Sequence, residues 1–255
     1  VAVSVTWAVT STTSTSALSP AAAKADGFAV TDVDGAVIAQ EGVDDSTSTE
    51  AGATSAATPE PTPVVTEAPE IEIRVYVDYL STGSAEFQLA NAAQLSTWVD
   101  EGAVSLTYYP VAMLTAKSNG TKYSLRAAAA SACVATHASD AFFKFNNALL
   151  EQQPDVDADG YSDTELADIA QASGVSNPKV VRACIEDGDF LSWAKKATER
   201  AVEEIPDTEG VQLTGTPLVL VNGSVYVGAL DDPKEFAQFV LTIDSDAYYQ
   251  TSSPT

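Results

Sequence analysis

The segment TGTPLVLVNG, residues 214–223, places Gly-Thr-Pro directly before a short run of β-branched and apolar residues. Cis peptide bonds are nearly confined to X-Pro, and a proline argues against the interior of a central strand. The pattern therefore predicts a cis Thr216–Pro217 peptide at the start of a strand, with an ordinary trans proline as the alternative. Asn222-Gly223 is a hairpin-turn signal, so residues 211–230 are expected to form two short antiparallel strands.

A β-α-β unit is predicted upstream of this hairpin. Residues 71–80 alternate apolar and polar side chains, as in a strand, and residues 84–102 carry apolar side chains at helical spacing. Residues 103–114 read as a second strand. A strand, a helix and a strand in about 40 residues indicate a parallel pair with a right-handed crossover.

Helices are predicted between this unit and the hairpin, and again after the hairpin. Ser162 and Glu165 form a capping-box pattern at the start of one of them. The predicted helical segments are 122–153, which holds two helices, 162–175, 177–205 and 232–244. The resulting order is that of an α/β thioredoxin fold with a helical insertion, which spans about residues 116–208 of a domain at 71–245.

The amino-acid composition of the chain before residue 71 differs from that of the rest. Residues 1–9, VAVSVTWAV, are apolar but too few to span a bilayer, which needs about 20 residues. The first 20 residues are therefore expected to be the remnant of a membrane anchor or signal segment. Residues 27–42 alternate apolar and polar side chains around Asp34-Gly35, which predicts a possible β-hairpin at 21–43. Residues 44–70 are rich in Ser, Thr, Ala, Pro and Glu and predict a disordered acidic linker. The tail, 246–255, is expected to be loosely ordered.

Charge and cysteine content exclude several kinds of site. The formal net charge of −24 argues against nucleic-acid binding, which needs a basic face. Two cysteines, Cys133 and Cys184, and one histidine, His137, cannot supply the four ligands of a structural zinc site. The two cysteines leave three possibilities: a disulfide, two buried thiols, or a nucleophile with a bystander.

The region 71–244 resembles the DsbA-like thiol-disulfide oxidoreductases, in particular the membrane-tethered, extracytoplasmic proteins of actinobacteria. The resemblance depends on the order of several motifs rather than on any single one. They are VYVDYL, YYPVAML, AAAASACVA, DTELADIAQASGV, RACIEDGDFLSWAKKAT and GTPLVLVNG. The resemblance implies that Thr216 and Pro217 form a loop that presents backbone to a bound peptide, facing the first helix of the domain.

The chain departs from the family where the family carries its catalytic C-x-x-C. Alignment on VDYL and EF places Ser81, Thr82, Gly83 and Ser84 at those four positions. A serine hydroxyl cannot cycle through a disulfide, and serine at this position is better explained as a helix N-cap. A serine nucleophile would need a general base, and His137 is the only histidine. A Cys-to-Ser variant of a working oxidoreductase is an alternative, although the Thr-Gly between the serines favours natural loss.

Cys133 and Cys184 match the positions of a structural disulfide that some actinobacterial relatives carry in the inserted helices. If this disulfide forms, it implies an oxidising, extracytoplasmic location.

A weak calcium motif lies at residues 155–166. Asp155, Asp157, Asp159 and Asp163 fit positions of an EF-hand loop, but Leu166 stands where a bidentate glutamate is required. A calcium-binding or structural surface protein is therefore a second alternative.

The leading hypothesis is a non-catalytic module that binds a protein partner or acts as an accessory subunit of a membrane protein complex. It needs no cofactor and no metal, and its tether to the membrane would be the N-terminus.

Overall fold

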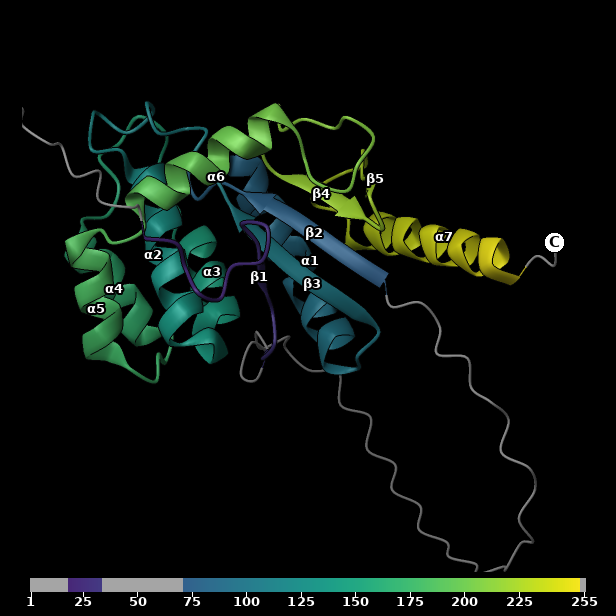
Figure 1. Ribbon diagram of the computed structural model, residues 1–255, viewed down its shortest axis with the longest axis horizontal. Helices are drawn as coiled ribbons and strands as arrows, with labels where there is room; N and C mark the ends of the chain where they lie inside the picture. Colours follow the sequence, from purple (N-terminus) through teal and green to yellow (C-terminus); the bar gives the residue numbers. More distant parts are fainter. Residues whose placement is uncertain (1–17, 34–70, 253–255) are drawn as a thin grey trace, which may run out of the picture.

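The computed structural model describes residues 18–33 and 71–252 of the 255-residue chain (Figure 1). Five strands form one mixed sheet in the order β1-β3-β2-β4-β5. The parallel pair β2–β3 and the antiparallel hairpin β4–β5 confirm the predicted halves of the fold. The strands are β1 Phe28–Ala29, β2 Ile71–Val77, β3 Val104–Pro110, β4 Leu218–Val221 and β5 Ser224–Val225.

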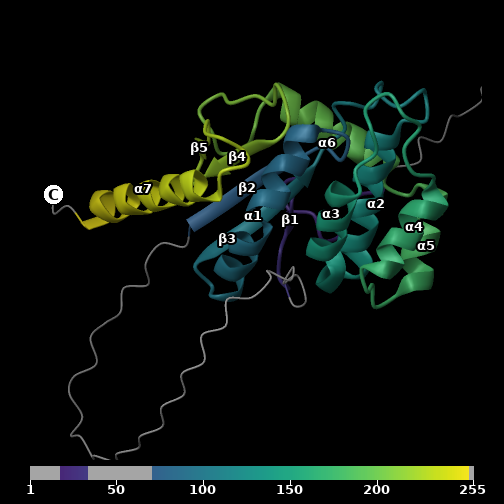
Figure 2. The same cartoon turned by 180° about the vertical axis from the view of Figure 1, so that it is seen from behind.

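Seven α-helices occur in the described part of the chain, and five of them, α2 to α6, lie between β3 and β4. This is the thioredoxin fold with a helical insertion that the sequence predicts. In Figures 1 and 2 helices α2 to α5 group beside the β1 edge of the sheet, and α7 extends away beyond β5. The helices are α1 Thr82–Asp100, α2 Tyr123–His137, α3 Phe142–Glu151, α4 Asp163–Ala172, α5 Pro178–Asp187, α6 Leu191–Glu203 and α7 Pro233–Ser252.

The sheet buries both of its faces. Successive side chains of a strand point to opposite faces, so Ile73, Val75 and Val77 share one face of β2. They belong to the main core, which also includes Phe87 of α1 and Phe236 of α7. A smaller cluster on the other face of β2 packs under the end of α6. Its buried members are Tyr76, Tyr109, Val111, Ala201, Ile205, Leu213 and Leu220.

Residues 18–33, here called the strap, pack against the domain although they precede it by 37 positions in the sequence. The strap adds β1 to the free edge of β3, where Phe28 pairs with Tyr108. The Phe28 side chain is 1% exposed, and its ring lies 5.6 Å from that of Phe142 and 5.4 Å from that of Trp193. The packed unit therefore includes residues that the sequence assigns to a separate segment.

Cys133 of α2 and Cys184 of α5 form a disulfide with an S–S distance of 2.00 Å. Both residues are almost completely buried, and they lie 51 positions apart. A cross-link over a loop of this length constrains the unfolded chain and typically stabilises a protein by about 2–4 kcal/mol. The disulfide therefore holds the inserted helices together.

Two predicted boundaries differ from the structure. Helix α7 continues to Ser252, so residues 245–252 are helical rather than part of a loose tail. The second strand of the β-α-β unit ends at Pro110 rather than near residue 114. The predicted hairpin turn at Asp34-Gly35, most of the anchor segment and the linker 44–70 lie outside the described residues.

None of the helices in the described ranges is long and apolar enough to cross a membrane.

Candidate functional site

The four residues Ser81, Thr82, Gly83 and Ser84 occupy the first turn of α1, immediately after β2. Ser81 is the N-cap of the helix, with an extended backbone (φ −86°, ψ 117°), and its Oγ accepts a hydrogen bond from the Ser84 amide at 3.4 Å. An N-cap serine satisfies one of the amide groups that a helix start leaves without a partner. The structure thus gives Ser81 the capping role that the sequence predicts.

The same Ser81 hydroxyl connects the helix to the proline loop. It donates a hydrogen bond of 2.7 Å to the carbonyl oxygen of Thr216, 135 positions later in the chain. The Thr216–Pro217 peptide is cis, as predicted. Gly83 lies against this loop, because a Cβ added to it would stand 3.1 Å from Pro217 Cδ and 3.4 Å from Thr216 O. The helix start and the cis-proline loop are therefore in direct contact, and we call this region the corner.

Asp78, at the end of β2, holds the other side of the corner. It is completely buried, and its carboxylate accepts hydrogen bonds from the Leu80 amide (2.9 Å), the Leu114 amide (2.8 Å) and the Ser124 hydroxyl (2.7 Å). The Asp78 amide donates to Ser84 Oγ at 3.3 Å. One carboxylate therefore joins β2, the segment after β3 and the start of α2.

Burial in an apolar surrounding raises the pKa of the Asp78 carboxyl, because the charged form loses its hydration. The hydrogen bonds from Leu114, Ser124 and Leu80 act in the opposite direction, because they favour the carboxylate. Desolvation is the larger effect.

The corner has neither a histidine base nor a thiol beside it. Ser124 of α2 contacts Asp78, whereas His137 is the last residue of the same helix. Thirteen residues at 1.5 Å each place His137 about 20 Å further along α2, and Cys133 about 14 Å along it. The structure therefore does not bring His137, or the disulfide, to the hydroxyls of Ser81 and Ser84.

The four aspartates of the calcium motif do not converge on a metal site. Asp163 forms an ion pair of 2.9 Å with Arg126, and the backbone carbonyl of Asp159 accepts a hydrogen bond from Thr121. Asp155 and Asp157 are exposed. Across residues 18–33 and 71–252, no group of three or more His, Cys, Asp or Glu side chains could hold a metal ion.

Comparisons with known proteins agree with this architecture. A family model described as Thioredoxin matches residues 66–245. The chain belongs to the thioredoxin family. The strap lies outside the residues that this family model matches.

Two solved structures from Mycobacterium tuberculosis confirm that this thioredoxin domain is DsbA-like. Oxidised DsbA superposes on this chain with a TM-score of 0.59 and 27% sequence identity. The match covers 76% of this chain and 95% of the DsbA chain. The reduced form of the disulfide-bond oxidoreductase DsbG gives a TM-score of 0.57 and 28% identity, over 76% and 90% of the two chains.

One curated relative is named as a protein kinase rather than as an oxidoreductase. The serine/threonine-protein kinase PknE of M. tuberculosis is 29% identical over 172 residues, which are 66% of this chain. The chain spans only 29% of the length of that kinase.

Sequence reasoning missed several residues that hold the corner of this thioredoxin domain. Asp78 gave a signal, because it is the one charged residue in the run VYVDYL, but its partners could not be identified from the sequence. Gln153 gave none; it follows α3, and its Nε2 donates to the carbonyl of Ser81 at 3.0 Å.

We predict that Ser81→Ala destabilises the domain by about 1–3 kcal/mol, because it removes both the N-cap and the hydrogen bond to Thr216. Urea unfolding followed by far-UV circular dichroism measures the change. Thr82→Ala is the matched control, since Thr82 is exposed in the same helical turn. Equal stabilities for the two variants would contradict the role assigned to Ser81.

We also predict a pH-dependent effect of Asp78→Asn. Because the pKa of Asp78 is higher in the folded than in the unfolded state, the stability that this carboxyl contributes is complete below the unfolded pKa and is lost as the pH rises through the folded pKa. Asparagine does not titrate, so the loss of unfolding free energy caused by Asp78→Asn should be largest in acid and shrink as the pH rises.

Urea titrations of both proteins between about pH 4 and about pH 8 test this sign. The exposed Asp187→Asn is the matched control for the removal of one carboxylate from the chain. A difference between wild type and Asp78→Asn that grows with pH would contradict the assigned direction.

Proposed function

We propose that this DsbA-like domain is a non-catalytic module that binds a protein partner at the corner. We further propose that Ser81, Thr82, Gly83 and Ser84 occupy the positions of the family's C-x-x-C. The observation that carries the proposal is the hydrogen bond between Ser81 Oγ and Thr216 O, which joins the helix start to the cis-proline loop through a hydroxyl.

The chemistry at the corner supports a loss of redox activity. Thiol-disulfide exchange needs a thiolate that attacks a disulfide, and a hydroxyl forms no such bond. Both cysteines of the chain are in the buried disulfide between α2 and α5, and neither lies on α1. The hydroxyls of Ser81 and Ser84 are buried and engaged in hydrogen bonds within the chain.

The surface around the corner supports partner binding. Thr82 is exposed at the first turn of α1, and Thr216 and Pro217 are half-buried beside it. Leu230 lies next to Gly83, and its carbonyl accepts a hydrogen bond from Asn91 of α1. The helix start, the cis-proline loop and the segment after β5 therefore meet in one place, with polar and apolar groups together.

The proposed location is the outer face of a cell membrane, where the partner would be a membrane protein complex. The Cys133–Cys184 disulfide supports an oxidising compartment. The apolar run at residues 1–9 supports a tether at the N-terminus.

Titration with the S-carboxymethylated insulin B chain tests the binding surface, because this extended peptide has no free thiol. We predict that its addition shifts the backbone amide resonances of Thr82, Gly83 and Thr216 in a saturable way. Gly83→Val should reduce the affinity at least ~10-fold, because its side chain would displace Pro217 and Leu230 from their present contacts.

Ala93→Leu serves as the control, since Ala93 is an exposed residue of α1 almost three turns from Gly83. Shifts that are absent, or that scatter over the surface without saturation, would contradict binding at the corner. Equal affinity in Gly83→Val and wild type would also contradict it.

A further inference from the structure

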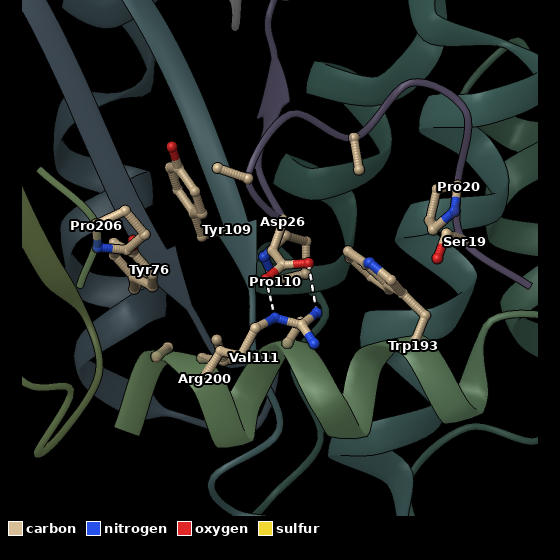
Figure 3. Close-up of a pocket in the computed structure, with 14 residues that line it drawn as sticks. Ser19, Pro20, Asp26, Tyr76, Tyr109, Pro110, Val111, Trp193, Arg200 and Pro206 are labelled. Atoms are coloured by element: carbon tan, nitrogen blue, oxygen red, sulfur yellow. Dashed lines mark hydrogen bonds and ion pairs between the residues drawn. The ribbon is translucent and has the colours of Figure 1, made fainter. Parts of the chain in front are cut away.

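A cavity of about 400 Å³ lies between the strap, the ends of β2 and β3, and α6 (Figure 3). This size is within the range of small-molecule sites in proteins. The cavity is at the carboxyl ends of two parallel strands, where α/β sheets commonly bind ligands. Tyr76 places it on the α6 face of the sheet, whereas α1 with the corner covers the opposite face. It is therefore separate from the corner.

The walls of the cavity are largely apolar and aromatic. The rings of Tyr76 and Tyr109 stack with centroids 4.4 Å apart and an interplanar angle of 16°. Trp193 of α6 and Pro110 continue the lining, and Pro20 and Ala23 of the strap close it from the other side. Flat rings pack well against such walls, because aromatic faces and edges attract one another.

The strap is fixed in place over this cavity. Lys24 and Gly27 exchange two backbone hydrogen bonds, and the residues between them, Ala25 and Asp26, have positive φ angles, as in a tight hairpin turn. A side chain at Gly27 would overlap the ring of Tyr109, with a Cβ–carbon distance of 2.6 Å. The glycine at position 27 therefore lets the strap lie directly against the ring of Tyr109.

One ion pair supplies the charged groups of the lining. Arg200 of α6 donates from Nε and Nη2 to the two carboxylate oxygens of Asp26, both at 2.6 Å. The pair is neutral overall, so the cavity offers no net charge to a charged ligand. A guanidinium has five N–H donors, and Asp26 takes two of them, which leaves donors for an oxygen acceptor on a ligand.

We propose that this cavity binds a small, neutral aromatic molecule that carries an oxygen acceptor. Its ring lies among Tyr76, Tyr109 and Trp193, and its oxygen accepts a hydrogen bond from Arg200. Because five of the fourteen lining residues belong to the strap, the bound molecule also holds the strap on the domain. The proposal does not depend on the function proposed for the corner.

Acetophenone is the probe that tests this proposal, with cyclohexyl methyl ketone and benzoate as comparison ligands. Binding is followed by the shift of the Trp193 indole N–H resonance, assigned with Trp193→Phe. Acetophenone should bind saturably and at least ~10-fold more tightly than either comparison ligand. Cyclohexyl methyl ketone lacks the aromatic ring, and benzoate adds a negative charge. Failure of acetophenone to saturate, or equal binding of the other two, would overturn the proposal.

Cavity-filling variants locate the site. Ala197→Leu fills the cavity from α6 and Ala23→Leu fills it from the strap, and each should weaken acetophenone binding at least ~10-fold. Ala93→Leu on α1 is the matched control and should bind as wild type does. Circular dichroism and the melting temperature identify a variant that has lost its fold, in which case the other filling variant decides.

Wild-type affinity in a folded filling variant would overturn the proposal, because it would place the probe elsewhere. An aromatic peptide that shifts Trp193 where acetophenone does not would also overturn it, in favour of a protein-docking site. Neither result bears on the corner, whose test uses Gly83→Val and a different set of resonances.

Discussion

The hydroxyl of Ser81 joins two parts of the chain that the fold must hold together. It accepts the hydrogen bond that caps α1 and donates one to the carbonyl before the cis proline. Gly83 leaves room for the proline ring to approach the helix, and Gln153 binds the Ser81 carbonyl from the inserted region. The two halves of the thioredoxin fold and the insertion between them therefore meet at Ser81. The corner keeps its geometry through hydrogen bonds that need no thiol.

The burial of Asp78 in this arrangement has a cost in desolvation free energy. A buried carboxylate loses its hydration, and in the folded protein three hydrogen-bond donors replace part of it, one from the nearby Leu80 and two from other segments. The loss is not fully offset, which is why the pKa of Asp78 is raised. The strap makes a different kind of contribution, because it buries Phe28 and covers the free edge of β3. Exposed sheet edges favour association with other chains, so covering this one protects the domain.

Much of this fold could be predicted from local sequence signals. The β2 and α1 patterns, the Ser162 cap and the Asn222-Gly223 turn act over a few residues, and each occurs where predicted. The alternating pattern at residues 27–42 indicated strand structure, but the place where the strap packs could not be predicted, because Phe28 contacts rings more than 100 positions away. The partners of Ser81 and Asp78 were missed for the same reason. Helix α7 runs past its predicted end at residue 244, because residues 245–252 contain no glycine or proline to stop a helix.

The corner of this DsbA-like domain holds its shape through hydrogen bonds that need no thiol. Turbidity from insulin reduction by dithiothreitol tests the proposed loss of redox activity most directly, with the native chain, its Ser81→Cys/Ser84→Cys variant and a buffer blank. We predict that the native chain precipitates insulin no faster than the blank, while the variant, with cysteines at the start of α1, accelerates the reaction. Turnover by the native chain above the blank would contradict the loss of redox activity.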